Sequence, residues 1–287
     1  MIPNEAAVTS SPWVGAKFTL VHLTDLHITA EEHLRARGVE TASRLRAAVE
    51  SVNRLWPEPA LAIITGDFSV GGSATGFRRA AELLTPLRIP MCAALGNHDD
   101  PETFRAIMES LGYAGGGEPC HALIVQGWRI LLLNSKWSGV KEGFLGPEQR
   151  QRVQEELERD PLVPTLLFTH HHIVPLGLPW VDRDNMRDWH EFLTMLREAG
   201  DVRGVFSGHA HQARHHSWGG IPFFVTPSTG YQFAQDAREV RVDWSDPPAY
   251  RFIRVVGDLF STEIRPVPPP DEDAGAAKPD SVAAGGK

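Results

Sequence analysis

The chain contains very little cysteine. Its 287 residues include only two, Cys92 and Cys120, which are too few for a disulfide framework. Cys92 lies in an apolar run, where a cysteine usually behaves as a small buried hydrophobic residue. We therefore expect inert thiols in a reducing compartment, and we predict a cytoplasmic location.

Long apolar runs and an excess of positive charge are also absent. No apolar run approaches the roughly 18 residues that suggest a membrane-spanning helix. The first residues, MIPNEAAVTSSPWVGAKF, lack the charged start and apolar stretch of a secretory signal. The formal net charge is −8, whereas a general nucleic-acid-binding surface is normally basic. These absences argue against a membrane protein and against a binder of nucleic-acid polymers.

The first half of the chain alternates apolar strands with amphipathic helices. The apolar spacing predicts strands at 17–25, 60–67 and 89–97, and helices at 41–56, 75–87 and 100–112. Strands that alternate with helices favour a mostly parallel sheet with right-handed crossovers. The fold class is therefore predicted to be α/β.

The second half mixes hairpins with further strands and helices. Hairpins are predicted at 121–135, 213–229 and 249–265, strands at 165–170 and 202–209, and helices at 146–160 and 185–200. Two stacked sheets with helices outside would accommodate all these elements in one domain.

The predicted domain covers residues 17–265. Residues 1–16 form an N-terminal extension in this scheme. Residues 266–287 are rich in proline, alanine, glycine and acids, a composition typical of a disordered tail.

Five predicted strands are followed by side chains that can bind metals. The segments are LTDLH with Asp25 and His27, TGD with Asp67, GNHD with Asn97 and His98, THHH with His170, His171 and His172, and GHAH with His209 and His211. Each alone could be a turn residue, a helix cap or a solvated histidine. Ligands gather at the carboxyl ends of parallel strands, so five such segments together predict one metal site.

The donor types restrict the metal. Carboxylate, imidazole and one amide, without thiolate, suit Mn, Fe, Co or Zn, and we favour iron and manganese. The donors are too many for one four-coordinate ion, so we expect two ions that share Asp67, held ~3.5–4 Å apart. Two carboxylates against two divalent ions leave the site positive, which suits an anionic phosphodiester.

The combined pattern resembles the calcineurin-like metallophosphoesterases. The motifs D-x-H, G-D, G-N-H-D, H and G-H-x-H follow one another in this chain. More narrowly, HHHIVPLGLPWVDRDNMRD and GHAHQ…TPSTGYQF look like segments of the bacterial class III 3′,5′-cyclic AMP phosphodiesterases. The resemblance runs from about residue 17 to about residue 265. It implies a four-layer α/β/β/α sandwich and a phosphodiesterase that converts 3′,5′-cyclic AMP to 5′-AMP.

The resemblance also implies roles for individual residues. One metal would take Asp25, His27, Asp67 and His211, and the other Asp67, Asn97, His170 and His209. The three consecutive histidines cannot be told apart by sequence alone, and the family pattern selects His170. The residues expected to contact the substrate are His27, Asp67, Asn97, His98 and His211.

The expected reaction is attack on phosphorus by a hydroxide that metal coordination makes available. His98 would act as the general acid that protonates the departing alkoxide. Asp99 would either orient His98 or cap the following helix, and the sequence leaves both roles open.

The segment from Gly177 to Asp188 is expected to lie at the rim of the site. Trp180 could stack on a nucleobase or simply pack, and both readings stay open. Arg183 and Arg187 are expected to be solvated. Asp182 and Asp184 are expected to cap the next helix, and Tyr231 and Phe233 to be packing residues.

Two other functions stay open besides the cyclic-nucleotide phosphodiesterase. One is a broad-specificity or glycerophosphodiester hydrolase with the same two metals. The other is a binding scaffold without catalysis, which the intact set of ligands and His98 disfavours. The partner in either hydrolase is a small phosphodiester, and the oligomeric state is left open.

Overall fold

The apolar segments of the first half form a five-stranded sheet. In the computed structural model, β1 (Lys17–Thr24), β2 (Leu61–Thr65) and β3 (Met91–Ala94) pair in parallel. The hairpin of β12 (Ala249–Val256) and β13 (Leu259–Pro266) adds to β1 in antiparallel orientation. The strand order is therefore β13-β12-β1-β2-β3.

A second sheet has six strands in the order β4-β5-β6-β7-β9-β8. The strands β5, β6, β7 and β9 are parallel, and the edge strands β4 and β8 are antiparallel to their neighbours. Their bounds are β4 Cys120–Val125, β5 Trp128–Leu133, β6 Thr165–Phe168, β7 Val202–Ser207, β8 Arg214–Trp218 and β9 Ile221–Val225.

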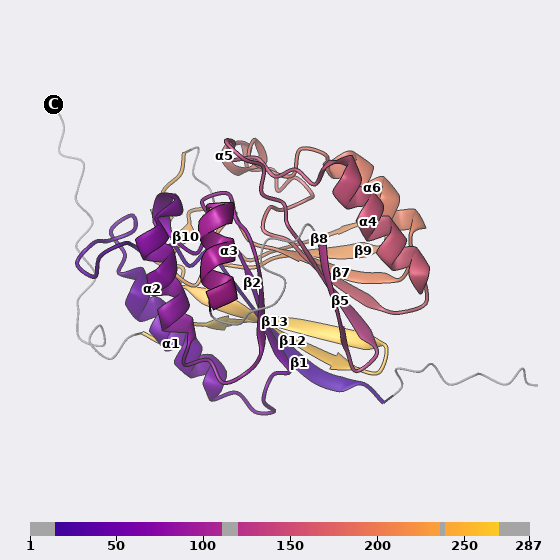
Figure 1. The fold of residues 1–287 in the computed structure, drawn as a ribbon, viewed down its shortest axis with the longest axis horizontal. Coiled ribbons are helices and arrows are strands. Elements are labelled where there is room, and N and C mark those ends of the chain that lie inside the picture. The colour runs from indigo at the N-terminus through magenta and orange to yellow at the C-terminus, as the bar shows by residue number, and fades with distance from the viewer. Residues whose placement is uncertain (1–14, 111–119, 236–238, 270–287) are drawn as a thin grey trace, which may run out of the picture.

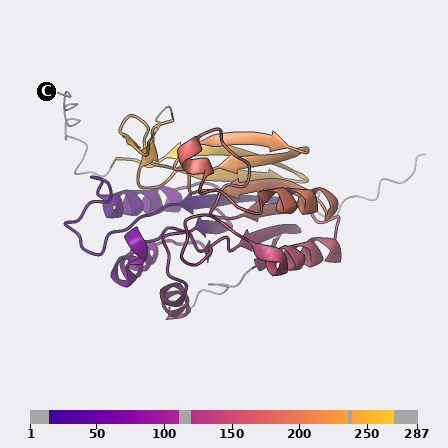
Figure 2. The same cartoon turned by 90° about the horizontal axis from the view of Figure 1, so that it is seen from above.

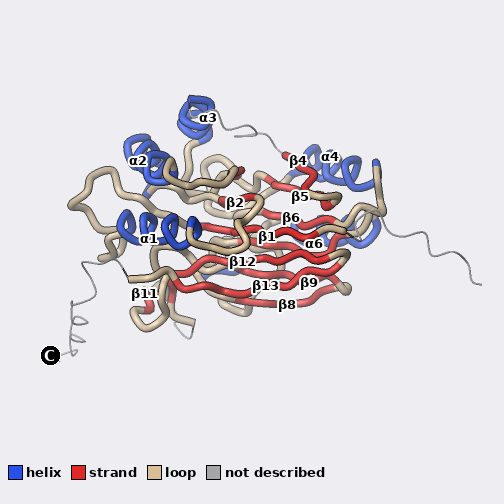
Figure 3. Tube along the Cα trace, turned by 90° about the horizontal axis from the view of Figure 1, so that it is seen from below, coloured by secondary structure: helices blue, strands red, loops and turns tan. Residues whose placement is uncertain are grey.

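Helices cover the outer face of each sheet. On one side of Figure 1 lie α1 (Thr41–Asn53), α2 (Ala74–Leu84) and α3 (Pro101–Ser110), and on the other side lie α4 (Gly146–Arg159) and α6 (Trp189–Glu198). The strands run between the two helical layers, as Figure 3 shows in red. The C-terminal strands, orange to yellow, lie at one margin of the molecule in Figure 2.

Three buried apolar clusters hold the layers together. One lies between the first sheet and its helices and includes Leu45 and Phe77, and another lies between the second sheet and its helices and includes Val153 and Phe192. A third cluster fills the space between the two sheets, with Phe168 among its members. The predicted four-layer α/β/β/α sandwich is confirmed.

The structure describes residues 15–110, 120–235 and 239–269. Most of the predicted extension and most of the predicted tail lie outside these ranges, so the domain bounds stay a prediction. Within the described ranges, no helix has the length and apolar content needed to cross a membrane. The side chain of Cys120 is outside the described set, and Cys92 is a buried free thiol whose pKa burial raises to about 12.

The predicted strands and hairpins are found, but several short elements were not expected. They are η1 (Val70–Gly72), α5 (Pro179–Asp182) and the two-residue strands β10 (Gln232–Phe233) and β11 (Val242–Asp243). The predicted helix at 185–200 begins only at Trp189. Asp182 and Asp184 do not cap it, because the capping position before it is Asp188.

A buried histidine joins the two sheets. His22 on β1 has one ring nitrogen, Nε2, 2.7 Å from Thr65 Oγ1 of the same sheet. The other nitrogen, Nδ1, lies 2.8 Å from Thr226 Oγ1, just after β9 of the second sheet. Arg251 Nε donates to the same Thr226 hydroxyl at 3.0 Å. An arginine can only donate, so the Thr226 hydroxyl accepts from Arg251, and in a neutral His22 one ring nitrogen donates to a threonine while the other accepts.

His22 is neutral in this bridge. Burial, together with the nearby Arg251 charge, lowers the pKa of His22 to about 3. The bridge is thus an uncharged polar link in an otherwise apolar interface between the sheets.

We expect Thr226→Val to destabilise the protein more than Thr226→Ser. Valine keeps the volume of threonine but leaves the His22 nitrogen and the Arg251 N–H without a partner. A buried unsatisfied polar group costs about 1–3 kcal/mol. Serine keeps the hydroxyl and loses one methyl group, worth about 0.8 kcal/mol. Urea unfolding of the three proteins measures the difference, and equal losses for valine and serine would contradict the role of the bridge.

Candidate metal centre

The structure brings the predicted strand-end side chains together where the two sheets meet. They follow β1, β2 and β3 of the first sheet and β6 and β7 of the second. Groups of these histidines and aspartates have donor atoms within 4.8 Å of one another. The residues are Asp25, His27, Asp67, Asn97, His170, His209 and His211.

One cluster gathers around His27 and His211. Their Nε2 atoms are 3.0 Å apart, and His211 Nε2 is 3.3 Å from Asp25 Oδ1. Asp67 Oδ2 lies 3.5 Å from His27 Nε2. Four donors thus face a common point, as the ligands of one ion do.

A second cluster gathers around Asn97. Its Oδ1 lies 3.0 Å from His170 Nε2 and 3.0 Å from His209 Nδ1. Asp67 Oδ2 is 3.6 Å from His170 Nε2, so the same carboxylate oxygen that faces the first cluster also faces the second. The geometry therefore offers two adjacent sites with Asp67 between them.

Backbone carbonyls set the orientation of two imidazoles. His170 Nδ1 lies 2.7 Å from the Thr65 carbonyl, and His211 Nδ1 lies 2.8 Å from the Tyr231 carbonyl. A carbonyl only accepts, so both Nδ1 atoms carry the proton. In the neutral form of each ring, Nε2 then carries the free lone pair and points into the clusters, as metal-binding imidazoles require.

Asp25 has one oxygen with partners and one without. Oδ2 accepts from Thr24 Oγ1 at 2.8 Å and from the His209 backbone N–H at 2.9 Å. Oδ1 is buried and has no hydrogen-bond donor. A buried carboxylate oxygen normally has a partner, so this orphaned atom, aimed at the imidazoles, fits a cation.

The protonation states also suit metal binding. Burial opposes the ionised form of Asp25, but His211 and the other imidazoles outweigh it and hold the pKa of that carboxyl below its usual range. Burial lowers the pKa of His27 to about 3 and that of His209 well below its usual value. Burial acts in the same sense on His170, yet the neighbouring carboxylates raise its pKa. Ionised carboxylates and neutral imidazoles bind metals, so His27 and His209 are in the binding form, whereas a protonated His170 would release its proton on binding.

The backbone is strained at these positions. Seven described residues other than glycine have positive φ angles, and five of them belong to the clusters: Asp25, His27, Asp67, His209 and His211. Such conformations persist where the surrounding structure enforces them, and they concentrate at functional sites.

Close packing explains the glycines beside them. A Cβ on Gly96 would lie 2.2 Å from Asp67 Oδ1, and a Cβ on Gly208 would lie 2.0 Å from Thr24 Oγ1. Only glycine lets these two loops approach the carboxylates.

The three consecutive histidines have three different partners. His170 faces the second cluster. His171 has both ring nitrogens occupied, by Ser135 Oγ at 2.8 Å and by the Lys141 carbonyl at 2.9 Å, so it anchors the loop after β5. His172 Nε2 lies 3.3 Å from Asp182, whose carboxylate also accepts from two backbone N–H groups ahead of α5.

Both roles considered for Asp99 are wrong. Its carboxylate accepts from the backbone N–H groups of Asp67 at 2.8 Å, Phe68 at 2.9 Å and Gly96 at 2.8 Å. Asp99 therefore ties the loop after β2 to the loop after β3. The capping role belongs to Asp100, which accepts from the Thr103 N–H at 2.8 Å.

His98 lies beside the clusters at the mouth of a cavity of about 310 Å³. Its ring packs edge-on against His27, with centroids 5.1 Å apart, and its backbone N–H donates to Asp67 Oδ1 at 2.8 Å. The side chain is half-buried. His98 is thus near the clusters and open to a bound molecule.

The rim of this cavity contains residues whose roles the sequence left open or did not predict. Trp180 is buried against Phe233 and also lines the cavity, as do Tyr231 and Arg183. Tyr231 and Phe233 are therefore packing residues that also face the cavity. Arg37 lines it too and was not singled out. Its only sequence signal is an Arg-Gly pair between two apolar residues.

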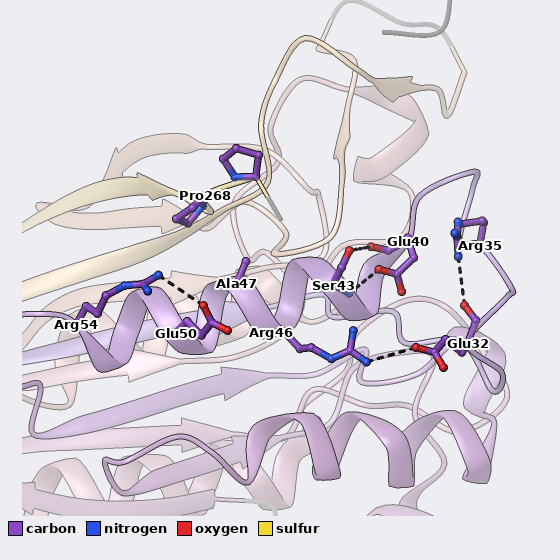
Figure 4. Close-up of a pocket in the computed structure, with 10 residues that line it drawn as sticks. Glu32, Arg35, Glu40, Ser43, Arg46, Ala47, Glu50, Arg54 and Pro268 are labelled. Carbon is purple, nitrogen blue, oxygen red and sulfur yellow. Dashed lines mark hydrogen bonds and ion pairs between the residues drawn. The ribbon is translucent and has the colours of Figure 1, made fainter. Parts of the chain in front are cut away.

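A separate groove runs beside α1 and contains none of the predicted site residues. Figure 4 shows that its charged side chains pair with one another: Arg46 with Glu32 at 3.8 Å and Arg54 with Glu50 at 3.7 Å. Mutually neutralised surface charges do not form a metal centre, so the strand-end clusters are the candidate site.

Comparison with known proteins identifies the family of the chain. The family description "calcineurin-like phosphoesterase" matches residues 18–213. The 3′,5′-cyclic adenosine monophosphate phosphodiesterase CpdA of Pseudomonas aeruginosa is 31% identical over 251 residues, which cover 87% of this chain and 90% of that protein. A probable cyclic nucleotide phosphodiesterase of Synechococcus is 33% identical over 226 residues, covering 79% of this chain and 85% of that protein.

The solved structures show the same fold. A dimetal phosphatase from Danio rerio has a TM-score of 0.63 at 14% sequence identity. The match covers 88% of this chain and 99% of that chain. At this identity the likeness concerns the fold alone.

We expect Asp67→Ala and Asn97→Ala to differ in metal content. Asp67 faces both clusters, so its removal should leave the protein with neither ion firmly bound, whereas Asn97→Ala should lose one of two. Each protein is stripped with a chelator, reloaded with Mn²⁺, dialysed and analysed for metal per chain, with wild type treated in the same way. Equal metal content in the two variants would exclude Asp67 as the shared ligand.

Proposed function

The chain belongs to the calcineurin-like phosphoesterase family, and on this premise we propose that it hydrolyses 3′,5′-cyclic AMP to 5′-AMP. The observation that carries the proposal is the pair of donor clusters that share Asp67 Oδ2 at the base of a small cavity. The name and full-length similarity of the Pseudomonas aeruginosa relative support the choice of cyclic AMP within the family.

The metal ligands are assigned as follows in this proposal. Asp25, His27 and His211 would hold one ion, Asn97, His170 and His209 would hold the other, and Asp67 would contribute to both. The donor set contains no thiolate and suits iron or manganese best. When bound, such a pair of cations supplies Lewis acidity and lowers the pKa of coordinated water.

The chain's own residues then bind and orient the diester. Asn97 contributes an uncharged amide oxygen. Only Asp25 and Asp67 would therefore offset the charge of two cations, and the net charge of the site would stay positive. A positive site attracts a monoanionic phosphodiester. His27, His211 and His98 surround the place where the phosphate lies. The small cavity is matched to a low-molecular-weight substrate, since small-molecule sites measure about 300–1,000 Å³.

His98 is proposed as the general acid. The His98 ring reaches the cavity from the loop after β3. The hydrogen bond from the His98 backbone N–H to Asp67 Oδ1 fixes the position of that loop. Protonation of the ribose 3′ oxygen by His98 would avoid expulsion of an unstabilised alkoxide. A positioned acid contributes about 10²–10⁴-fold to the rate.

We expect His98→Ala to lower kcat for cyclic AMP by about 10²–10⁴-fold while the metal content stays at the wild-type level. An activated ester with a p-nitrophenolate leaving group needs little protonation, so its kcat should fall much less. Steady-state kinetics with both substrates, together with metal analysis, measures this. Equal losses for the two esters would remove His98 from the acid role.

We expect cyclic AMP to be cleaved at the P–O3′ bond, with 5′-AMP as the only product. The measurement is kcat/KM across cyclic AMP, cyclic GMP, 2′,3′-cyclic AMP, glycerophosphodiesters and simple monoesters, with products separated by chromatography. A preference of several orders of magnitude for a glycerophosphodiester or a monoester would make the substrate assignment wrong and favour the broader hydrolase.

A further inference from the structure

Arg37 occupies an unusual position in the backbone. The neighbours Ala36 and Val39 exchange two backbone hydrogen bonds, at 2.9 and 2.8 Å. Between them, Arg37 has a φ of 49° and Gly38 a φ of 87°. Two successive left-handed residues are typical of a type I′ turn, which favours asparagine, aspartate or glycine at both positions. The turn therefore retains an arginine against the local backbone preference.

The Arg37 side chain lies over an aromatic ring that faces the site. Its guanidinium carbon is 5.3 Å from the centroid of the Phe233 ring. The Tyr231 side chain also lies beside Arg37. Tyr231 in turn stacks on His27, with centroids 5.5 Å apart and ring planes at 25°. One aromatic ring therefore separates Arg37 from the donor clusters.

Arg37 has no ion-pair partner among the residues that the structure describes. Some other exposed arginines do: Arg183 lies 3.6 Å from Asp184, and Arg46 lies 3.8 Å from Glu32. The Arg37 side chain is exposed, one face of its planar guanidinium packs on Phe233, and the Tyr231 hydroxyl is a hydrogen-bond partner. In a chain of net charge −8, Arg37 is a cation at a cavity without a carboxylate partner among the described residues.

The cavity connects Arg37 with the clusters. Its volume is about 310 Å³, and its lining includes His27, Asp67 and His98 as well as Arg37 and Phe233. Ala36, Trp180 and Val181, which pack in one apolar cluster with Phe233, also line it, and the charged Arg183 and Asp184 follow them. A ligand with an anionic end and a flat, partly apolar end matches such a cavity.

We propose that Arg37 is a specificity-determining residue that contacts the nucleobase of the substrate. The inference rests on the proposed function, which places the phosphate among His27, His98 and His211. The base is the part of a nucleotide that reaches past Tyr231. Bases stack on guanidinium planes, and their ring nitrogens accept hydrogen bonds from arginine. The strained turn holds the guanidinium in place before the base arrives.

The test compares Arg37→Asn with wild type in the metal-loaded protein. Asparagine suits the left-handed turn, so the fold is retained and the cation is removed. We expect the Kd for 5′-AMP and the KM for cyclic AMP to rise at least tenfold, while Kd for inorganic phosphate and kinetics with bis(p-nitrophenyl) phosphate change less than twofold. The thermal midpoint should be equal to that of wild type or higher.

Arg35→Asn is the matched control. Arg35 lies in the same loop, is exposed and lines the groove beside α1 and not this cavity. The Arg35→Asn substitution removes the same charge away from the cavity. It should therefore leave the two Kd values, the KM and the kinetics with bis(p-nitrophenyl) phosphate unchanged. Arg37→Lys keeps the charge but has no planar face, and it should lose most of the selectivity for 5′-AMP over phosphate. This variant carries the test if Arg37→Asn does not fold.

Three outcomes would overturn the inference. If phosphate and 5′-AMP weaken by the same factor, Arg37 acts on the phosphate and not on the base. If 5′-AMP binding is unchanged, or if all ligands weaken along with a lowered thermal midpoint, Arg37 is a structural residue. A wild-type protein that hydrolyses bis(p-nitrophenyl) phosphate but no cyclic nucleotide would refute the proposed substrate, and the two equilibrium binding measurements would still decide the role of Arg37.

Discussion

The packing of one sheet on the other is the constraint on which the site depends. The first sheet contributes Asp25 and Asp67, and the second contributes His170 and His211, so neither sheet holds a complete cluster. Donor atoms 3.0–3.6 Å apart tolerate little sliding between the layers. Apolar packing alone is non-directional, so it sets the spacing of the sheets better than their register. The His22 bridge is directional, and it ends at Thr65, whose carbonyl holds the His170 ring.

The clusters are arranged at a cost to the stability of the chain. Two carboxylates are buried close together without a lysine or arginine partner among the described residues, and left-handed backbone recurs at the same positions. Burying such charges is unfavourable unless they are paired or coordinate a metal. Bound cations would therefore stabilise the folded chain as well as serve the reaction, since a ligand that binds only the folded state adds to its stability. The Asp99 carboxylate accepts hydrogen bonds from three backbone N–H groups and so holds the loop after β2 against the loop after β3 without any cation.

Much of this arrangement could be predicted from sequence because it depends on local patterns. The end of a parallel strand is visible as an apolar run that stops at a glycine and an acid, and five such ends imply one convergent edge. The roles of Asp99 and Arg37 could not be predicted, because their partners come from distant segments: Phe68 for the first and Phe233 for the second. The two-residue strand β10 is equally invisible, since too few residues carry its pattern.

The residues proposed for the chemistry and those proposed for substrate selectivity lie on different parts of the structure. The donor atoms lie on loops fixed by strand ends, by close glycine contacts and by carbonyl-bound imidazoles, so small changes there would disturb both clusters at once. The far wall of the cavity is assembled from three separate segments: the turn at Arg37, the short helix α5 and the chain around Phe233. Of these, α5 is held to the core through Asp182 and His172, next to His170. Substitutions in the wall can therefore change which diester fits while the donor geometry is kept, which is how one metal centre can serve different substrates on the same fold.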